Sequence, residues 1–307
     1  MTAWFEVNME RRDFTIAHSG LTFHVTEWGP AKGFPVVMLH GIRGYGETFS
    51  GVAQALQPGC RVIAYDQRGR GNSDWDPKRD YYTDTYVADL AAIVDHLKLQ
   101  QFDLLGHSMG GINAIVYASL HPERVRKLVI EDAGPGAFES SPGAARIRQE
   151  LASTPDGFAS WETASTFMRA LRPTITEEAR QQRLKSMLKA TPEGGLTWRY
   201  DHAGIAATRL QPDATRVVDL RPHVARIACD TLLLRGDKTD YLQAEMAQAM
   251  QALNPRITCQ EIAGAGHYIH DDQPAAFNAA VCNFLGSPQI SPASVAGLNT
   301  QGHPHAA

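Results

Sequence analysis

The segment Leu104–Gly111, LLGHSMGG, constrains the fold of this chain more than any other stretch. It reads as an apolar strand, then a sharp turn that carries Ser108 between glycines, and then a helix from Ile112 to His121. The pattern G-x-S-x-G is typical of a sharp strand-to-helix turn that presents a serine hydroxyl. Glycines relieve the crowded backbone, and the first helical N–H groups face any negative charge that develops there. The pattern also fits a turn that only packs a helix on a strand, so other residues must decide.

Strands and helices are expected to alternate along most of the chain. Continuous short apolar runs are typical of strands that are buried on both faces. Since alternating strands and helices form parallel sheets with right-handed crossovers, we expect an α/β fold, with a mostly parallel central sheet flanked by helices. The expected strands are 14–18 and 21–28, which form a hairpin, and 35–39, 61–65, 102–105, 125–131, 231–235 and 257–262; the expected helices are 48–56, 86–97, 112–121, 242–253 and 274–285.

Residues 137–225 interrupt this alternation. They contain helical stretches around 144–151, 161–171 and 177–189, and no convincing buried strand. We therefore expect an α/β core of residues 1–136 and 226–285, with a helical cap at 137–225 inserted between two strands of its sheet. Residues 286–307 are rich in Ser, Pro, Gly, Ala and Asn without periodicity, which predicts a disordered tail.

The composition excludes several classes of protein. A formal net charge of −4 argues against nucleic acid or an anionic membrane surface as the main partner. No apolar run is long enough to cross a membrane, and residues 1–13 show no apolar signal-peptide core, so a cytoplasmic protein is expected. The cysteines are too widely spaced for metal ligation and are expected to be free thiols: Cys60, Cys229, Cys259 and Cys282. No metal site is expected.

A catalytic serine needs a base, and His267 is the candidate. It follows the last expected strand in the sequence Gly264-Ala-Gly-His267, and such loops face the crevice where α/β sheets bind ligands. The alternative interpretation, that His267 is an ordinary residue of a surface loop, does not explain why glycines precede it. His270 is expected to be a packing or capping residue, and its H-x-x-H spacing with His267 is a weak metal signal without a third ligand.

An oxyanion hole needs two backbone donors near the serine. One is expected to be the N–H of Met109, which follows Ser108, and the other the N–H of Ile42, in the loop after strand 35–39. Asp66, with Arg68 and Ser73, is expected to form a structural turn around tight glycines rather than to take part in catalysis.

Four motifs in order resemble the α/β-hydrolase fold family: HGIRG, DQRGRGNS, GHSMGG and GAGHYIH. The resemblance covers about residues 14–285 and implies that fold with an inserted helical cap. It also implies the chain order nucleophile, acid, histidine and a reaction without a cofactor. The motifs are more specific for the fold than for the reaction.

The acid departs from the family's commonest pattern. Most members place it three residues after the glycine that ends the penultimate strand, and that position here is Thr239, flanked by Asp237 and Asp240. In a minority of members the acid follows the strand after the serine helix, where this chain has Asp132. We expect Asp132 to be the acid, with Asp240 as the alternative and Asp237 as a distant third. Either carboxylate would orient His267 and stabilise the imidazolium.

Within the fold, the chain most resembles hydrolases of pyridine-ring breakdown, among them N-formylmaleamate deformylase and 2-(acetamidomethylene)succinate hydrolase. The shared features are the Asp-x-Arg-Gly-x-Gly run at 66–71, the position of Asp132 and a cap that ends before Thr231. Those enzymes cleave small amides that carry carboxylates, without a metal. The resemblance suggests that Arg43 pairs with a substrate carboxylate. The cap offers further candidates for the substrate pocket: Arg169, Arg172 and Arg199 for charge, and Trp161, Phe167, Met168, Trp198 and Tyr200 for an apolar wall.

These observations predict a cofactor-free serine hydrolase that acts on a small ester, amide or related carbonyl compound. Ser108 attacks, His267 is base and then acid, Asp132 orients His267, and the N–H groups of Ile42 and Met109 hold the oxyanion. Two alternatives stay open: a cofactor-independent oxygenase or lyase that uses the histidine as base, and a non-catalytic receptor for a small ligand. The sequence leaves the substrate and the oligomeric state undecided.

Overall fold

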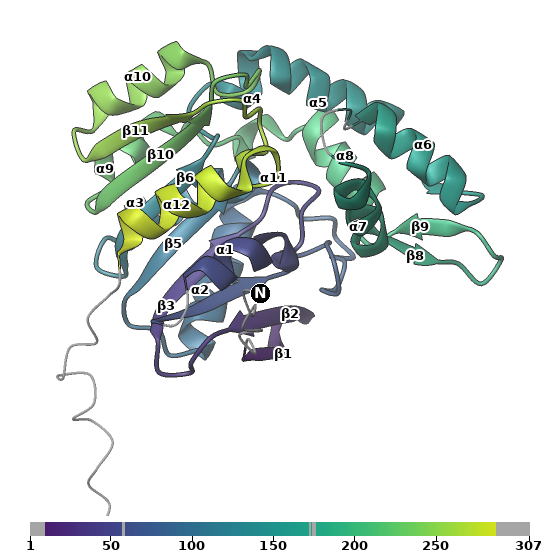
Figure 1. Cartoon of the computed structure of the whole chain (residues 1–307), viewed down its shortest axis with the longest axis horizontal. Coiled ribbons are helices and arrows are strands. Elements are labelled where there is room, and N and C mark those ends of the chain that lie inside the picture. Colours follow the sequence, from purple (N-terminus) through teal and green to yellow (C-terminus); the bar gives the residue numbers. More distant parts are fainter. Residues whose placement is uncertain (1–9, 57–58, 172, 174–175, 287–307) are drawn as a thin grey trace, which may run out of the picture.

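The computed structural model describes residues 10–56, 59–171, 173 and 176–286. Each of the eight strands expected for the main sheet is present, and they form one sheet in the order β1-β2-β4-β3-β5-β6-β10-β11 (Figure 1). The β1–β2 and β2–β4 pairs are antiparallel, and the other pairs are parallel. In sequence order the strands are β1 (Arg11–His18), β2 (Leu21–Trp28), β3 (Phe34–Leu39), β4 (Cys60–Tyr65), β5 (Phe102–His107), β6 (Val125–Glu131), β10 (Asp230–Gly236) and β11 (Ile257–Ile262).

The central strands are buried on both faces because helices cover both. In β3, Val36 and Met38 belong to one apolar core, and Val37 and Leu39 belong to the other. This alternation follows from the two-residue period of a strand and explains the continuous apolar runs in the sequence. The first core includes residues of α1 (Ser50–Ala55) and α12 (Pro274–Leu285); the second includes residues of α2 (Thr83–His96), α3 (Met109–Leu120), α9 (Arg221–Arg226) and α10 (Ala244–Leu253).

A long insertion separates β6 from β10, and Figure 1 shows most of it gathered on one side of the sheet. We propose that residues 137–225 of this insertion act as a cap over the site. The expectation that this interval lacks strands was wrong, since it contains a small antiparallel sheet in the order β7-β9-β8. These strands are only two or three residues long, too short to show a periodic pattern. The elements of the insertion are α4 (Ala137–Ser140), α5 (Pro142–Ser153), β7 (Gly157–Phe158), α6 (Trp161–Leu171), α7 (Glu177–Met187), β8 (Leu188–Ala190), β9 (Leu196–Trp198), α8 (His202–Leu210), η2 (Ala214–Arg216) and α9.

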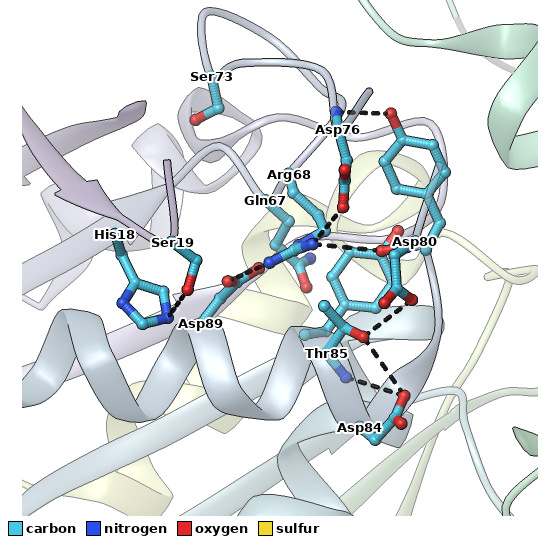
Figure 2. A network of polar contacts seen from close by, with 12 residues as sticks. His18, Ser19, Gln67, Arg68, Ser73, Asp76, Asp80, Asp84, Thr85 and Asp89 are labelled. Carbon is cyan, nitrogen blue, oxygen red and sulfur yellow. Dashed lines mark hydrogen bonds and ion pairs between the residues drawn. The ribbon is translucent and has the colours of Figure 1, made fainter. Parts of the chain in front are cut away.

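The turn at 66–73 has the structural role expected of it. The Asp66 carboxylate accepts hydrogen bonds from two backbone N–H groups, those of Gly46 and Asn72. Figure 2 shows Arg68 held between two carboxylates, Asp89 on α2 and Asp76 in the following loop. The turn needs glycine at position 71 because φ there is +57° and a Cβ would lie 2.2 Å from Asp66 Oδ2.

The remaining short elements are η1 (Gly46–Phe49) and α11 (Ile269–Asp272), which follow β3 and β11 respectively. Among the described residues, none of the helices combines the length and the hydropathy required to span a bilayer. Of the tail expected to be disordered at 286–307, residues 287–307 lie outside the part of the chain that the structure describes.

Candidate active site

Ser108 lies at the turn between β5 and α3, as the G-x-S-x-G pattern predicted. Its φ of +53° is unusual for a residue with a side chain, and such strain is common where a structure presents a reactive group. The turn is tight because the helix approaches the strands closely: a Cβ on Gly106 would lie 2.3 Å from Gly110 O, and one on Gly110 would lie 2.1 Å from Leu39 O. The glycines are therefore required by packing, and they leave Ser108 at the end of β5.

Three side chains from distant parts of the chain form one hydrogen-bonded line. His267 Nε2 lies 2.9 Å from Ser108 Oγ, and His267 Nδ1 lies 2.7 Å from Asp132 Oδ2. Because a carboxylate only accepts hydrogen bonds, the proton of a neutral His267 sits on Nδ1. The lone pair of Nε2 then faces the serine hydroxyl. This arrangement suits His267 for accepting the proton of Ser108.

Asp132 follows β6 and is completely buried. Its backbone has φ of +49°, and its N–H donates to Leu234 O at 2.8 Å, which fixes the residue against β10. Burial raises the pKa of the Asp132 carboxyl, while a hydrogen bond from Thr239 and the charge of Arg235 oppose that rise. Thr239 Oγ1 donates at 2.7 Å to the same oxygen, Oδ2, that faces His267. Thr239 thus stands where most members of the resembling family have the acid, and it donates to a carboxylate that follows the neighbouring strand β6.

The alternative acids have other partners. Both oxygens of Asp240 accept from Arg146, at 2.7 and 2.9 Å, and this pairing lowers the pKa of Asp240. Asp237 accepts from the backbone N–H of Gly264 at 2.7 Å. The structure therefore brings Asp132 to His267, and it directs the carboxylate of Asp240 to the cap.

Ser108 opens onto a cavity of about 230 Å³. Ile42 and Met109, the two residues expected to supply the oxyanion N–H groups, also line it. Among the described residues, neither of these two N–H groups has a hydrogen-bond acceptor. Most of the wall is apolar and is supplied by core and insertion together: Ile42, Met109, Ile112, Phe138, Ile147, Leu210, Pro212, Val217, Val218, Leu220 and Tyr241.

The charge of the cavity wall is entirely positive, since Arg148, Arg209 and Arg216 line it and no described lining residue is acidic. Arg216 is held by two aspartates outside the cavity. Arg148 and Arg209 lie against the ring of Phe138, at 4.8 and 5.6 Å from its centre, and neither has an ion-pair partner among the described residues. Burial lowers the pKa of Arg209. The cavity therefore contains two guanidinium groups that lack an anion.

The expected substrate contacts are mostly placed elsewhere. Arg43 donates to Glu150 Oε2 at 2.9 Å and to Thr154 Oγ1 at 3.1 Å, so its charge is compensated by the insertion. The expectation that Trp161 and Trp198 line the pocket was wrong. Trp161 is more than one-third exposed and donates to Gln181, because its helix turns that side outward. Trp198 is buried against aromatic residues at the centre of the small sheet.

His270 packs inside the molecule, as expected, but it has partners that the sequence did not suggest. Its Nδ1 lies 2.8 and 2.9 Å from the two oxygens of Glu131. Burial lowers the pKa of His270, but the nearby carboxylates outweigh that effect and raise it above its usual value. His107 Nε2 donates to the carbonyl of His267 at 3.0 Å. The potential metal-ligating atoms of His107, Glu131 and His270 lie within 4.8 Å of one another, but these hydrogen bonds already account for their arrangement.

Comparison with known proteins gives the family. The alpha/beta hydrolase fold profile matches residues 35–274. A Bacillus subtilis (strain 168) protein, provisionally assigned as 2-succinyl-6-hydroxy-2,4-cyclohexadiene-1-carboxylate synthase, is 30% identical over 278 residues, which cover 87% of this chain and 96% of that protein. The 2-(acetamidomethylene)succinate hydrolase of Mesorhizobium japonicum is 26% identical over 265 residues, which cover 86% of this chain and 92% of that protein.

A solved structure agrees with this result. The crystal structure of E-2-(acetamidomethylene)succinate hydrolase superposes with a TM-score of 0.79 at 24% identity and covers 90% of this chain and 99% of that chain. Other relatives bear the names of a diacylglycerol lipase and an oligomer hydrolase. The profile match extends over most of the sequence and includes all four motifs. The chain therefore belongs to the α/β-hydrolase fold family.

Proposed function

We propose that this chain is a serine hydrolase that cleaves a small, carboxylate-bearing ester or amide through an acyl-enzyme. The observation that carries the proposal is the hydrogen-bonded line Ser108–His267–Asp132, whose serine lines a cavity together with Ile42 and Met109. Relatives named as hydrolases and lipases support the reaction class. The proposed chemistry uses these side chains and no cofactor.

In the first half-reaction, Ser108 Oγ attacks the substrate carbonyl and His267 Nε2 takes the hydroxyl proton. The Asp132 carboxylate stabilises the imidazolium that forms. The carbonyl oxygen becomes an oxyanion and accepts from the N–H groups of Ile42 and Met109. The C–O or C–N bond then breaks, and His267 returns the proton to the leaving alcohol or amine.

In the second half-reaction, water replaces the leaving group. His267 removes a proton from the water, the hydroxide attacks the acyl carbonyl, and the oxyanion is held by the same two donors. When the new tetrahedral species collapses, the bond to Ser108 Oγ breaks and His267 protonates the serine. The products are a carboxylic acid and a free enzyme in its starting protonation state.

The positive wall supports a substrate that carries a carboxylate. Arg148 lies on α5 and Arg209 lies on α8, and both helices contribute to the cavity wall. Neither arginine has an ion-pair partner among the described residues. An unpaired, partly buried guanidinium is costly, and a bidentate carboxylate would compensate it. The apolar remainder of the wall suits a short carbon chain. A cavity of about 230 Å³ suits a small molecule.

The test compares p-nitrophenyl acetate with small acylated enamines and amino acids that carry one or two carboxylates. We expect the wild-type chain to prefer the carboxylate-bearing substrates and Ser108→Ala to lose nearly all turnover of both kinds. Arg148→Gln should raise KM for the carboxylate substrates by about tenfold or more, because the variant loses the binding free energy of one ion pair. KM for the neutral ester should not change. Arg169→Gln is the matched control, because Arg169 is an exposed cap arginine paired with Glu177. Equal effects of the two variants would contradict the carboxylate assignment.

A second candidate reaction is favoured by one comparison. The Bacillus subtilis relative bears the name of a synthase rather than a hydrolase. On the same geometry, His267 could act as a base in a lyase or oxygenase reaction that forms no acyl-enzyme. Stopped reactions distinguish the two candidates: an acyl group on Ser108 supports the hydrolase, whereas turnover without any adduct supports the second candidate.

A further inference from the structure

Arg70 lies completely buried in the 66–73 turn, and among the described residues it has no carboxylate partner. Arg68, two positions earlier in the same turn, forms ion pairs with Asp76 and Asp89. One turn therefore contains a compensated and an uncompensated arginine. A buried charge without a counter-ion is destabilising, so its presence points to a use outside the packing of the turn.

The contacts of Arg70 reach both residues that the proposed mechanism assigns to the oxyanion hole. Nε donates to the carbonyl oxygen of Ile42 at 3.2 Å, and Nη2 lies 3.2 Å from Met109 Sδ. The other contacts hold the guanidinium itself: Nη1 donates to Arg68 O at 2.8 Å and to the hydroxyl of Tyr86. The ring of Tyr86 also lies 5.1 Å from the guanidinium carbon. Arg70 is thus a fixed group that connects the loop after β3 with the first residue of α3.

We propose that Arg70 is a positioning residue of the oxyanion hole, a role that rests on the proposed serine hydrolase mechanism. Its hydrogen bond to Ile42 fixes the loop that supplies one N–H donor, and its contact with Met109 fixes the residue that supplies the other. Its positive charge lies against the two residues that carry the donors and favours the state in which the cavity holds a negative charge.

The charge acts selectively because it lacks a partner in the resting enzyme. The substrate carbonyl is neutral, whereas the tetrahedral intermediate carries a negative charge on oxygen, so Arg70 stabilises the transition state more than the bound substrate. The field of Arg70 reaches the cavity: burial is the largest cause of the lowered pKa of Arg209, and the charge of Arg70 contributes to it. We therefore expect substitution of Arg70 to lower kcat and to leave KM nearly unchanged.

The experiment uses the full chain and its Arg70→Gln and Arg70→Lys variants, with phenylboronic acid as a probe. A boronic acid forms a tetrahedral, negatively charged adduct on an active-site serine and so reports on stabilisation of the intermediate. We expect Arg70→Gln to weaken phenylboronate inhibition and to lower kcat on p-nitrophenyl acetate by the same factor, about 10- to 100-fold, which is less than the loss of a direct oxyanion donor. Arg70→Lys keeps the charge and should lose less than about fivefold in both measurements.

The controls separate this role from a general effect on folding and from the proposed function. Labelling of wild-type Ser108 by a fluorophosphonate comes first, and failure there contradicts the serine hydrolase mechanism and not the placement of Arg70. Circular dichroism establishes that each variant is folded. In folded Arg70→Gln, an unchanged boronate affinity, or an equal loss in KM, would overturn the proposal. If Arg70→Gln does not fold, Arg70→Lys decides: a loss greater than about tenfold with the charge retained would overturn it.

Discussion

Exchanging the triad carboxylate for an amide gives the sharpest prediction. Asp132 Oδ2 accepts from His267 Nδ1 and from Thr239 Oγ1, each at 2.7 Å. In Asp132→Asn, an amide oxygen held by Thr239 no longer carries the charge that stabilises the imidazolium. An amide turned the other way would present N–H groups to Nδ1, which would then accept and leave the proton of His267 on Nε2, facing the serine. The first orientation weakens His267 as a base because the imidazolium is no longer stabilised by a charge, and the second removes the base function.

The expected cost is about 10⁴ in kcat/KM, the size of loss seen when such a triad holds the wrong tautomer, or about 5.4 kcal/mol of transition-state stabilisation at 1.36 kcal/mol per factor of ten. Asp240→Asn is the matched control. It removes a partly exposed ion pair with Arg146, which is worth about 0–1 kcal/mol of stability, and should change kcat/KM by less than about threefold. The assay is steady-state hydrolysis of p-nitrophenyl acetate by both variants at pH 7.5. A large loss for Asp240→Asn and a small one for Asp132→Asn would refute the assignment of the acid.

Three further predictions concern the supports of the site. Gly110→Ala should unfold the chain or destabilise it by about 3 kcal/mol or more in urea titrations, because its Cβ would meet backbone, whereas Gly59→Ala, with open space around its Cβ, should be neutral. Thr239→Val should lower kcat about tenfold by removing one hydrogen bond to the triad carboxylate, and Thr239→Ser should restore most of it. A hydrogen bond that the His24 ring donates to the Asp66 carboxylate raises the pKa of His24, so this pair stabilises the folded state below pH 6.5 and the effect is lost as pH rises through the folded pKa. The difference in unfolding free energy between wild type and His24→Gln should therefore shrink from pH 5.5 to pH 8.5, and an increase would contradict the assignment.

The parts of the fold that the sequence revealed are those with local signals. Continuous apolar runs predicted each strand of the main sheet, and the glycine patterns around Ser108 and His267 predicted the turns that place them. These turns require positive φ angles or close contacts between backbone segments, and such positions select glycine. The glycines in the sequence therefore indicated where Ser108 and His267 lie.

The sequence favoured Asp132 over Asp240 as the proposed acid only through the family resemblance. Asp132 and Thr239 lie 107 positions apart, and they meet because β6 and β10 are adjacent parallel strands whose carboxyl ends share an edge of the sheet. Without strand neighbours, the sequence could only weigh Asp132 against Asp240. A signal was nevertheless present: a threonine at the usual acid position keeps a hydroxyl where a carboxylate is expected, which indicates a donor to an acid from elsewhere.

The substrate wall could not be predicted, because tertiary packing decides which cap residues face the cavity. Trp198 has the large aromatic side chain expected of a pocket wall, but it is buried in the interior of the small sheet. Phe138, Arg148 and Arg209 face the cavity, yet each lies on a helix whose orientation the sequence pattern does not specify. Arg43 has the charge expected of a substrate contact, but the insertion supplies its partner, Glu150. The sequence does not show which arginines have ion-pair partners, because those partners come from distant parts of the chain.

The acyl-enzyme is the most direct test of the proposed function. The chain is mixed with an excess of p-nitrophenyl acetate, quenched in acid within the first turnovers, digested and analysed by mass spectrometry. We expect an acetyl group on the peptide that contains Ser108, its disappearance as substrate is exhausted, and no adduct in Ser108→Ala. A folded wild-type chain that turns over ester while Ser108 stays unmodified, or that carries the acetyl group on another residue, would contradict it.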